Sequence, residues 1–225
     1  MTKTDLRLER KKQRWKENRL DILKAAEDVF VQKGYNLASM DDIAHGAQFS
    51  KATLYRYFNS KRDIFFEVIL NSFEAVIMKV RKIQEEEGNA EHKLKEIIRF
   101  ALRFFYQKKH ISRMFLMEKF FMRTLLKLSP EKKGALSEQE LGFLEGIRTK
   151  KENILKVIIE ILEEGIKTGE FRKVNAHDAA HAFEAMLHGF YFTKFWYEKE
   201  YDIDTGIKLI REFFLKGIRR EKKPE

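Results

Sequence analysis

The chain has 225 residues, a net charge of +10, two prolines, 11 glycines and no cysteine. The lack of cysteine excludes disulfides, thiolate metal sites and a cysteine nucleophile. No stretch reaches the roughly 18 to 20 consecutive apolar residues that a membrane span needs, and the first residues contain no apolar run like that of a signal peptide. We therefore expect a cytoplasmic protein with no membrane association, and the abundance of helix-forming residues predicts an all-α fold.

The first predicted helix covers residues 19–33, after about 13 residues that we expect to be frayed. Its apolar residues recur along one helical stripe, and Gly34 should end the helix. Residues 40–46 form a short second helix, because Ser39 is followed three residues later by Asp42 in a capping arrangement. The residues of the apolar stripe are Ile22, Leu23, Ala25, Ala26, Val29 and Phe30.

Two further capped helices follow the second one. Ser50 is placed to cap a third helix over residues 51–58. Ser60 and Asp63 repeat the capping arrangement at the start of a long helix that ends near residues 85–89. Three capped starts in so short a stretch predict a compact three-helix unit, in which residues 40–58 have the layout of a helix-turn-helix.

The exposed side of the third helix carries residues suited to DNA. On a helical wheel of about 100° per residue, Leu54 and Phe58 face the core, and Ala52, Thr53 and Arg56 face outward. Arg56 suits a bidentate contact to guanine, and the small Ala52 permits a close approach to the bases. Tyr55 and Tyr57 flank this face, where their hydroxyl groups can reach phosphates, as can Lys51 and Lys61 at two helix starts.

Charge is unevenly distributed along the chain. Residues 1–62 contain 14 Lys and Arg against 8 Asp and Glu, a net charge of +6, whereas the other 163 residues carry +4. A basic end of this kind is typical of a nucleic-acid-binding region. The alternative is a solvated lysine-rich surface without a partner.

Longer helices with wide apolar faces follow Gly88. We predict them over residues 91–109, 112–128, 138–168, 178–199 and 204–219, with breaks in the loop that contains Pro130 and at Gly169, which can adopt the left-handed conformation. The predicted domains are therefore a DNA-binding domain over 14–62 and a larger helical domain over 63–220.

The N-terminal pattern resembles the TetR family of transcriptional regulators over about residues 15–70. Two positions depart from that pattern. Gln48 replaces a usual glycine, so the turn must either accept a non-glycine residue at positive φ, at roughly 1 kcal/mol, or adopt another geometry. Ala52 replaces another frequent glycine. The matching residues are Ile22, Leu23, Ala25, Ala26, Phe30, Gly34, Tyr35, Ala38, Ser39, Met40, Ile43, Ala44, Ala47, Ser50, Thr53, Leu54, Tyr55, Tyr57, Phe58 and Lys61.

The resemblance implies a regulator, most often a repressor, that binds a palindromic double-stranded DNA operator as a homodimer and is released by a small hydrophobic effector. The larger domain would bind that ligand and form the dimer. Together with the wheel, the resemblance gives these candidate DNA contacts: Ser39, Met40, Phe49, Ser50, Lys51, Ala52, Thr53, Tyr55, Arg56, Tyr57 and Lys61.

The last two predicted helices would form the dimer interface, as the resemblance implies. Small residues allow close packing on the first, and apolar residues line the second. Two aromatic stretches further upstream are candidates for the effector pocket, with plain core packing as the alternative. The interface candidates are Ala182, Ala185, Met186, Gly189, Ile207, Ile210, Phe213, Phe214 and Ile218, and the pocket candidates are Phe104, Phe105, Met117, Phe120, Phe121 and Met186.

Other functions have weaker support in the sequence. His177 and His181 have a spacing that a metal site could use, with His188 two turns on, but no clear third ligand accompanies them, so we expect no metal and no cofactor. There is no glycine-rich phosphate loop or nucleophile elbow, and we expect no enzymatic activity. The rival is an all-helical enzyme or lipid-carrying protein whose basic end touches membranes.

Overall fold

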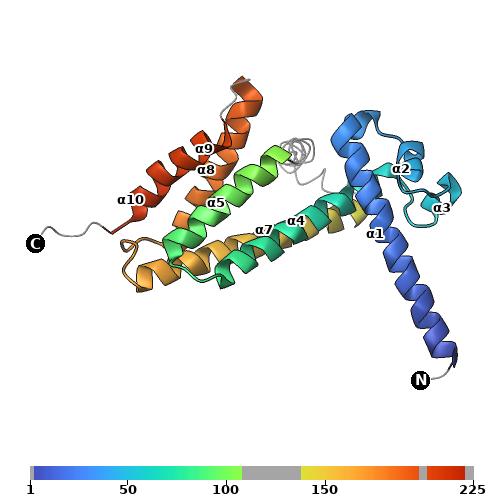
Figure 1. The fold of residues 1–225 in the computed structure, drawn as a ribbon, viewed down its shortest axis with the longest axis horizontal. Helices are drawn as coiled ribbons and strands as arrows, with labels where there is room; N and C mark the ends of the chain where they lie inside the picture. Colours follow the sequence, from blue (N-terminus) through green and yellow to red (C-terminus); the bar gives the residue numbers. More distant parts are fainter. Residues whose placement is uncertain (1–2, 108–137, 198–201, 221–225) are drawn as a thin grey trace, which may run out of the picture. The chain divides into compact units, whose positions relative to one another are not determined.

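The computed structural model describes residues 3–107, 138–197 and 202–220, and these are helical apart from short connections (Figure 1). The predicted all-α fold is confirmed in this part of the chain, where an isolated bridge between Phe171 and Arg219 is the one extended pairing. None of the helices described here combines the length and hydrophobicity that crossing a membrane requires. The helices are α1 (Lys3–Leu37), α2 (Met40–Gly46), α3 (Lys51–Tyr55), α4 (Lys61–Glu85), α5 (Ala90–Gln107), α7 (Glu138–Lys167), α8 (Ala176–Tyr197), α9 (Ile203–Ile210) and α10 (Lys216–Ile218), with a π-helical turn η2 (Arg211–Leu215).

The chain divides into two compact units. One combines residues 1–72 with 109–143, and the other combines 73–108 with 144–225. We call them the N-terminal unit and the C-terminal unit and describe each by itself. The predicted helix over 112–128 and the loop at Pro130 lie outside the described residues.

Helix α1 begins much earlier than the sequence predicted. It starts at Lys3 rather than near Arg19, because residues 3–18 contain no glycine or proline and consist mostly of good helix formers, with Asp5 in the first turn. The predicted break at Gly34 is confirmed: this residue has φ 74° and ψ 161° and kinks the helix. The frayed segment that we expected is therefore a helical extension.

The N-terminal unit is built around aromatic and aliphatic side chains from α1 to α4. Ile22, Phe30, Leu54 and Phe65 are each at most 2% exposed. The rings of Phe30 and Phe65 meet edge to face with centroids 5.6 Å apart, a favourable aromatic geometry. The apolar stripe predicted for α1 therefore faces the core and holds α3 and α4 against it.

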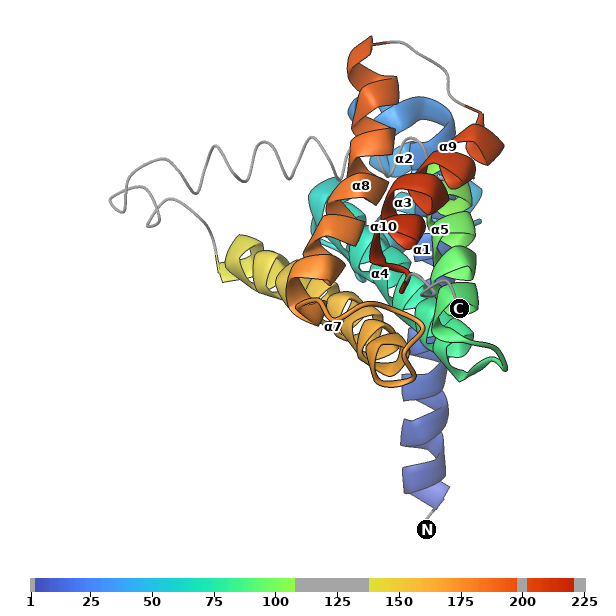
Figure 2. The same cartoon turned by 90° about the vertical axis from the view of Figure 1, so that its left-hand side faces the viewer.

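The C-terminal unit has a larger apolar core. Helices α5 and α9 lie side by side, and α8 packs against both (Figure 2). Helix α7 ends at Lys167, and Gly169 follows with φ 76°, so the predicted break at Gly169 is confirmed. The most deeply buried core side chains are Leu94, Ile98, Ile161, Leu162, Phe183 and Ile210.

The last helical segment corrects the predicted dimer interface. Ile207, Ile210, Phe214 and Ile218 are at most 7% exposed and belong to the core of their own unit. They pack within the chain because the stripe on which they lie faces α5 and α8. By contrast, Phe213 is 69% exposed.

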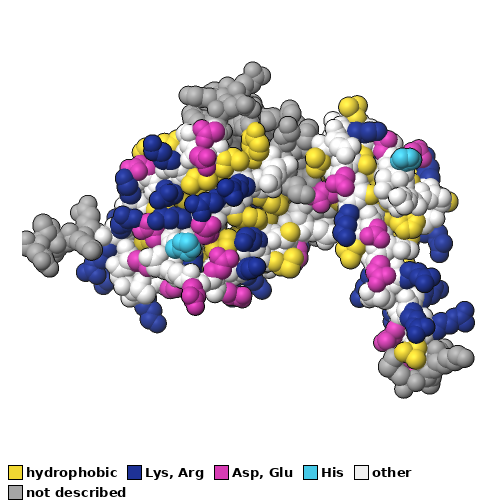
Figure 3. Space-filling view, viewed as in Figure 1, with side chains coloured by type: hydrophobic (Ala, Val, Ile, Leu, Met, Phe, Trp, Pro, Cys, Tyr) yellow, Lys and Arg dark blue, Asp and Glu magenta, His cyan; other side chains and the backbone are white. Residues whose placement is uncertain are grey.

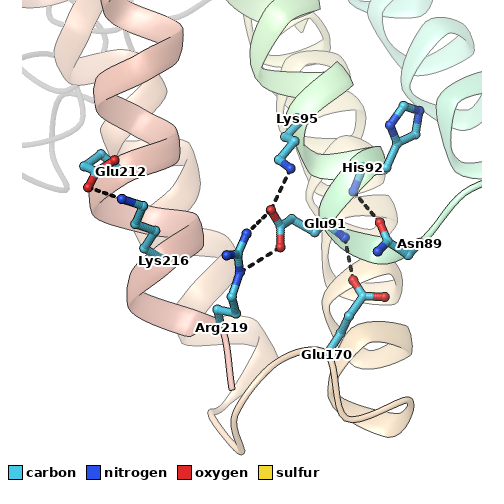
Figure 4. Close-up of polar contacts among 8 residues, drawn as sticks. All are labelled: Asn89, Glu91, His92, Lys95, Glu170, Glu212, Lys216 and Arg219. Carbon is cyan, nitrogen blue, oxygen red and sulfur yellow. Dashed lines mark hydrogen bonds and ion pairs between the residues drawn. The ribbon is translucent and has the colours of Figure 1, made fainter. Parts of the chain in front are cut away.

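A polar cluster joins the start of α5 to the end of α10 (Figure 4). The Glu91 carboxylate accepts hydrogen bonds from Arg219, at 3.0 Å from Nε, and pairs with Lys95 Nζ at 2.6 Å. The backbone N–H of Glu91 donates to Glu170 Oε2 at 2.8 Å. Burial opposes the charged form of Glu91, but the hydrogen bonds from Arg219 and Lys95 outweigh it and hold its pKa below the ordinary value.

Candidate nucleic-acid interface

Helix α3 presents the predicted face to solvent. Ser50 caps the helix by accepting the Thr53 N–H at 3.1 Å. Leu54 is fully buried and Phe58 is 3% exposed, which confirms them as inward anchors. Ala52 and Arg56 are exposed, Tyr55 is 47% exposed, and Thr53 is half-buried with its hydroxyl 2.8 Å from that of Ser50.

The helix is shorter than predicted. It ends at Tyr55 instead of Phe58, because the N–H groups of Arg56 and Tyr57 bond to the carbonyls three residues earlier, at 3.1 and 3.0 Å. Such bonds tighten the last turn of a helix. Phe58 N–H still bonds to Leu54 O at 3.1 Å, so the wheel places Phe58 correctly.

The turn between α2 and α3 accepts a non-glycine residue at positive φ. Gln48 has φ 58°. Its N–H donates to His45 O at 3.1 Å, and the next N–H, of Phe49, donates to Ala44 O at 2.9 Å. This pair of bonds is the Schellman motif, in which the left-handed position is usually glycine. Of the two alternatives given for Gln48, a non-glycine residue at positive φ is therefore correct, and another turn geometry is not.

The start of α2 is capped as predicted. Ser39 Oγ accepts the Asp42 N–H at 3.1 Å, and Asp42 Oδ2 accepts the Ser39 N–H at 3.0 Å. Hydrogen bonds from Lys33 and Ser39 lower the pKa of Asp42 to about 2. The ion pair from Lys33 on α1, at 2.6 Å, connects the first two helices.

Lys51 lies beside this capped start. Its Nζ is 2.7 Å from Asp41 Oδ2, and that hydrogen bond raises the pKa of Lys51. The two side chains are 52% and 65% exposed, and an ion pair so exposed contributes little stability. A phosphate can therefore replace Asp41 as the partner of Lys51 at small cost.

Three of the candidate contacts are held by interactions within the protein. Met40 is 9% exposed and belongs to the core. Tyr57 is half-buried, and its hydroxyl accepts a hydrogen bond from Asn18 Nδ2 at 2.9 Å. Lys61 Nζ donates to the carbonyl oxygens of Tyr35 and Ala38 at 2.7 and 2.6 Å, so it satisfies groups at the end of α1 instead of facing outward. The candidate DNA-binding surface therefore consists of the candidate contacts other than Met40, Tyr57 and Lys61.

Arg19 is the structural residue that the sequence analysis missed. Its guanidinium donates to the Tyr57 carbonyl at 2.8 Å and pairs with Glu67 on α4. It also lies over the Phe58 ring, 4.2 Å from the centroid, while Trp15 packs 5.5 Å from Tyr57. The signal was the spacing of Trp15, Asn18 and Arg19 on one side of α1, between the residues expected to be frayed and the start of the predicted helix.

The predicted effector pocket is described only in part. Phe104 and Phe105 are half-buried on α5 with ring centroids 6.3 Å apart, and Met186 packs against the core of the C-terminal unit. Met117, Phe120 and Phe121 lie outside the described residues. A surface hollow of about 170 Å³ is lined by different residues, namely Lys208, Arg211, Glu212, Leu215, Lys216 and Arg219.

The histidines do not come together. His177 and His181 are exposed, and Nδ1 of His188 lies 3.9 Å from Oε1 of Glu184. Among the side chains that the structure describes, no group of three metal-ligating residues is present.

A short capped helix, a tight turn and a second helix with a solvent-facing polar edge define the N-terminal unit as a helix-turn-helix domain, the class found in transcription regulators. The family model described as "Bacterial regulatory proteins, tetR family" matches residues 22–68. Over these residues the chain is similar to the TetR family of transcriptional regulators. The family model therefore agrees with the resemblance noted from the sequence.

Two curated relatives show how far the similarity extends. The chain is 39% identical over 66 residues to the HTH-type transcriptional activator FasR of Mycolicibacterium smegmatis, covering 29% of this chain and 30% of FasR. It therefore spans about a third of that regulator's length. It is 25% identical over 154 residues to the fatty acid metabolism regulator protein of Bacillus subtilis, covering 68% of this chain and 71% of the relative.

A solved structure shares the fold over most of the chain. The transcriptional regulator FadR from Bacillus subtilis, solved in complex with stearoyl-CoA, superimposes with a TM-score of 0.63 at 21% identity. The match covers 89% of this chain and 99% of FadR. This chain therefore shares the helical arrangement of FadR well beyond its helix-turn-helix domain.

Proposed function

We propose that the protein is a ligand-responsive repressor that binds a palindromic operator as a homodimer in the cytoplasm. The observation that carries the proposal is the solvent-facing edge of the segment from Ser50 to Arg56, fixed from behind by Leu54 and Phe58. In the major groove, Arg56 would contact a guanine and Ala52 would allow close approach. Lys51, Tyr55 and the N–H groups at the start of α3 would contact phosphates.

A homodimer supplies the second recognition helix that a palindrome requires. Two half-sites read by a two-fold dimer lie roughly 34 to 36 Å apart, about one turn of DNA. The exposed Phe213 and the exposed small residues Ala182, Ala185 and Gly189 support an interface on α8 and η2. A large exposed aromatic is a typical interface anchor.

The effector that we propose is a long-chain fatty acyl compound. The relative from Bacillus subtilis is named a fatty acid metabolism regulator, and FadR was solved with stearoyl-CoA. The aromatic residues Phe100, Phe104 and Phe105 on α5 supply an apolar surface of the kind that an acyl chain requires.

The signal would travel through α4. This helix begins in the N-terminal unit, where Lys61 and Glu67 tie it to α1, and its residues from Phe73 onward belong to the C-terminal unit. A ligand shifts such an element only if it binds two conformations with different affinity. We propose that acyl binding favours the conformation with the wrong separation of the two recognition helices.

DNA binding is tested with a duplex taken from upstream of the protein's own gene. We expect salt-sensitive, sequence-preferring binding by the native protein. Arg56→Ala should lose roughly ten-fold or more in preference for that duplex over random DNA, because a bidentate base contact provides about 1 to 3 kcal/mol of discrimination. Arg103→Ala, an exposed arginine outside the N-terminal unit, is the control. An unchanged preference in Arg56→Ala would refute the assigned role.

The effector is tested by adding stearoyl-CoA, free CoA or choline to the protein–DNA complex. We expect stearoyl-CoA to release the DNA and the other two to leave it bound. Tighter DNA binding with stearoyl-CoA would make the protein an acyl-dependent binder and contradict the release model. No response to any acyl compound, together with no acyl species in mass spectra of the denatured protein, would exclude this class of effector.

A further inference from the structure

Residues 3–17 form a helical arm on α1. All described side chains from Asp5 to Glu17 are exposed, and contacts with the rest of the N-terminal unit begin at Trp15 and Asn18. The arm is continuous with the core-facing part of α1, so it has a definite direction within this unit. A solvated helical segment this long requires an explanation, because an isolated helix of about 15 residues is only marginally stable.

The charges of the arm are sorted onto two edges. Arg7, Arg10, Lys11 and Arg14 have the spacing i, i+3, i+4 and i+7, which places them on one side of a helix. No ion pair joins these four cations to another side chain within the described residues. We call them the basic edge. On a wheel of about 100° per residue, the opposite edge carries Asp5, Glu9, Lys12 and Lys16, whereas Glu17 lies beside Arg10 and Arg14.

The basic edge leads toward the segment from Ser50 to Arg56, which we call the recognition segment. Asn18 follows Arg7, Lys11 and Arg14 on the same stripe, and its amide donates to the Tyr57 hydroxyl just after α3. Figure 3 agrees: within the N-terminal unit, Lys and Arg side chains gather on the side of the arm where α3 lies, and acidic side chains gather on the other. The contacts of Trp15, Asn18 and Arg19 hold this orientation.

We infer that the basic edge binds DNA phosphates that flank the operator, an inference that rests on the proposed function. The arm is roughly 22 Å long at about 1.5 Å per residue. It can therefore follow about six base pairs beyond the segment read by α3, given one phosphate per strand every 3.4 Å. Such contacts add affinity and orientation without reading sequence.

An anionic membrane is the other surface that could attract these cations. Amphipathic helices that bind membranes carry a broad apolar face opposite their cations. The face opposite the basic edge carries Asp5 and Glu9 instead, and the exposed Leu6 and Leu8 do not form a stripe. The charge pattern therefore favours DNA.

The test compares two double variants that remove equal charge. Arg7→Gln with Arg14→Gln neutralises the basic edge, and Lys12→Gln with Lys16→Gln neutralises the opposite edge. Glutamine keeps the helix propensity of the arm, so both variants should fold. DNA binding of the full chain is measured against salt concentration on two duplexes, one with long flanks and one trimmed to the operator.

On the long duplex, the basic-edge variant should bind about ten-fold or more weakly near 0.1 M salt. The slope of log K against log salt should become shallower by about 1.8 per protomer, or 0.9 for each lost phosphate contact. The control variant should bind like the native protein, and trimming the flanks should abolish the difference. Equal weakening of the two variants would overturn the inference.

Other outcomes separate the inference from the function on which it rests. If the native protein binds no duplex, the proposed function fails, and the inference falls with it. If the native protein binds DNA but the basic-edge variant loses only its affinity for phosphatidylglycerol vesicles, the edge is a membrane contact and the DNA assignment is wrong.

Discussion

Both units of the protein have an apolar core, and that of the C-terminal unit is the larger one. In the N-terminal unit, side chains bond to specific backbone groups: serines cap α2 and α3, Arg19 bonds to the Tyr57 carbonyl, and Lys61 bonds to the end of α1. In the C-terminal unit, a large apolar cluster from α5, α7, α8 and α9 provides the packing. Directional bonds fix exposed side chains within fractions of an ångström, whereas apolar packing tolerates exchange of similar residues.

The largest effect should come from opening a cavity in the apolar cluster. Leu162→Ala, at a fully buried position of the C-terminal unit, should cost about 2 to 5 kcal/mol of unfolding free energy. The measurement is urea denaturation followed by circular dichroism. Leu37→Ala, at a position 80% exposed in the N-terminal unit, is the control and should change little. A loss of less than 1 kcal/mol in Leu162→Ala would show that the C-terminal core repacks freely.

Removing Arg19 should test the directional bonds of the N-terminal unit. Arg19→Ala loses the bond to Tyr57 and leaves Glu67 without this partner, so we expect a loss of about 2 to 3 kcal/mol. DNA affinity should fall as well, because the end of the recognition segment loses its support.

Arg19→Lys should recover only part of that loss, since an ammonium cannot reproduce the guanidinium fork. Lys24→Ala, exposed on the same helix, should be neutral. Hydrogen exchange at Tyr57 and Phe58 reports the local effect. Unchanged protection in Arg19→Ala would mean that the apolar anchors suffice.

A smaller, opposite effect is expected at the turn. Gln48→Gly should raise the unfolding free energy by up to about 1 kcal/mol, because glycine adopts φ 58° without strain. Gln48→Ala keeps the Cβ atom and should give no gain. Equal stability of the glycine and alanine variants in thermal unfolding would show that Gln48 is unstrained.

The smallest effect should be an acid-dependent loosening between α1 and α2. The folded pKa of Asp42 is about 2 against an ordinary value of 3.8. Its contribution is therefore complete above about pH 4 and is lost as the pH falls through 2. The carboxyl carbon shift of Asp42 in NMR spectra gives the midpoint. Lys33→Ala should move that midpoint upward, and Lys24→Ala should leave it in place.

Local signals in the sequence were sufficient for much of the fold. Serine followed by an acid predicted the start of α2 at Met40, and the helical wheel separated Leu54 and Phe58 from Ala52 and Arg56. Long-range bonds were not visible in this way. The partners of Lys61 and Arg19 lie 23 to 48 positions away, and no local pattern encodes such pairing.

The same limit explains the two main corrections. About the first 13 residues were expected to be frayed because they lie at a chain end, although their helix propensity was high throughout. The apolar stripe of the last helix was assigned to a partner, because a sequence shows that a face is apolar but not which surface covers it. The effector-pocket and DNA-contact residues remain predictions.

The hydrogen bond between Lys61 and the carbonyl of Ala38 closes a loop. These residues lie 23 positions apart and mark the two ends of the stretch that contains α2 and α3. The segment from Ala38 to Lys61 is thus closed by the Lys61 ammonium group, and Arg19 also bonds to it at the Tyr57 carbonyl. Because these bonds tie the segment to both α1 and α4, we expect a tilt at the start of α4 to move α2 and α3 together.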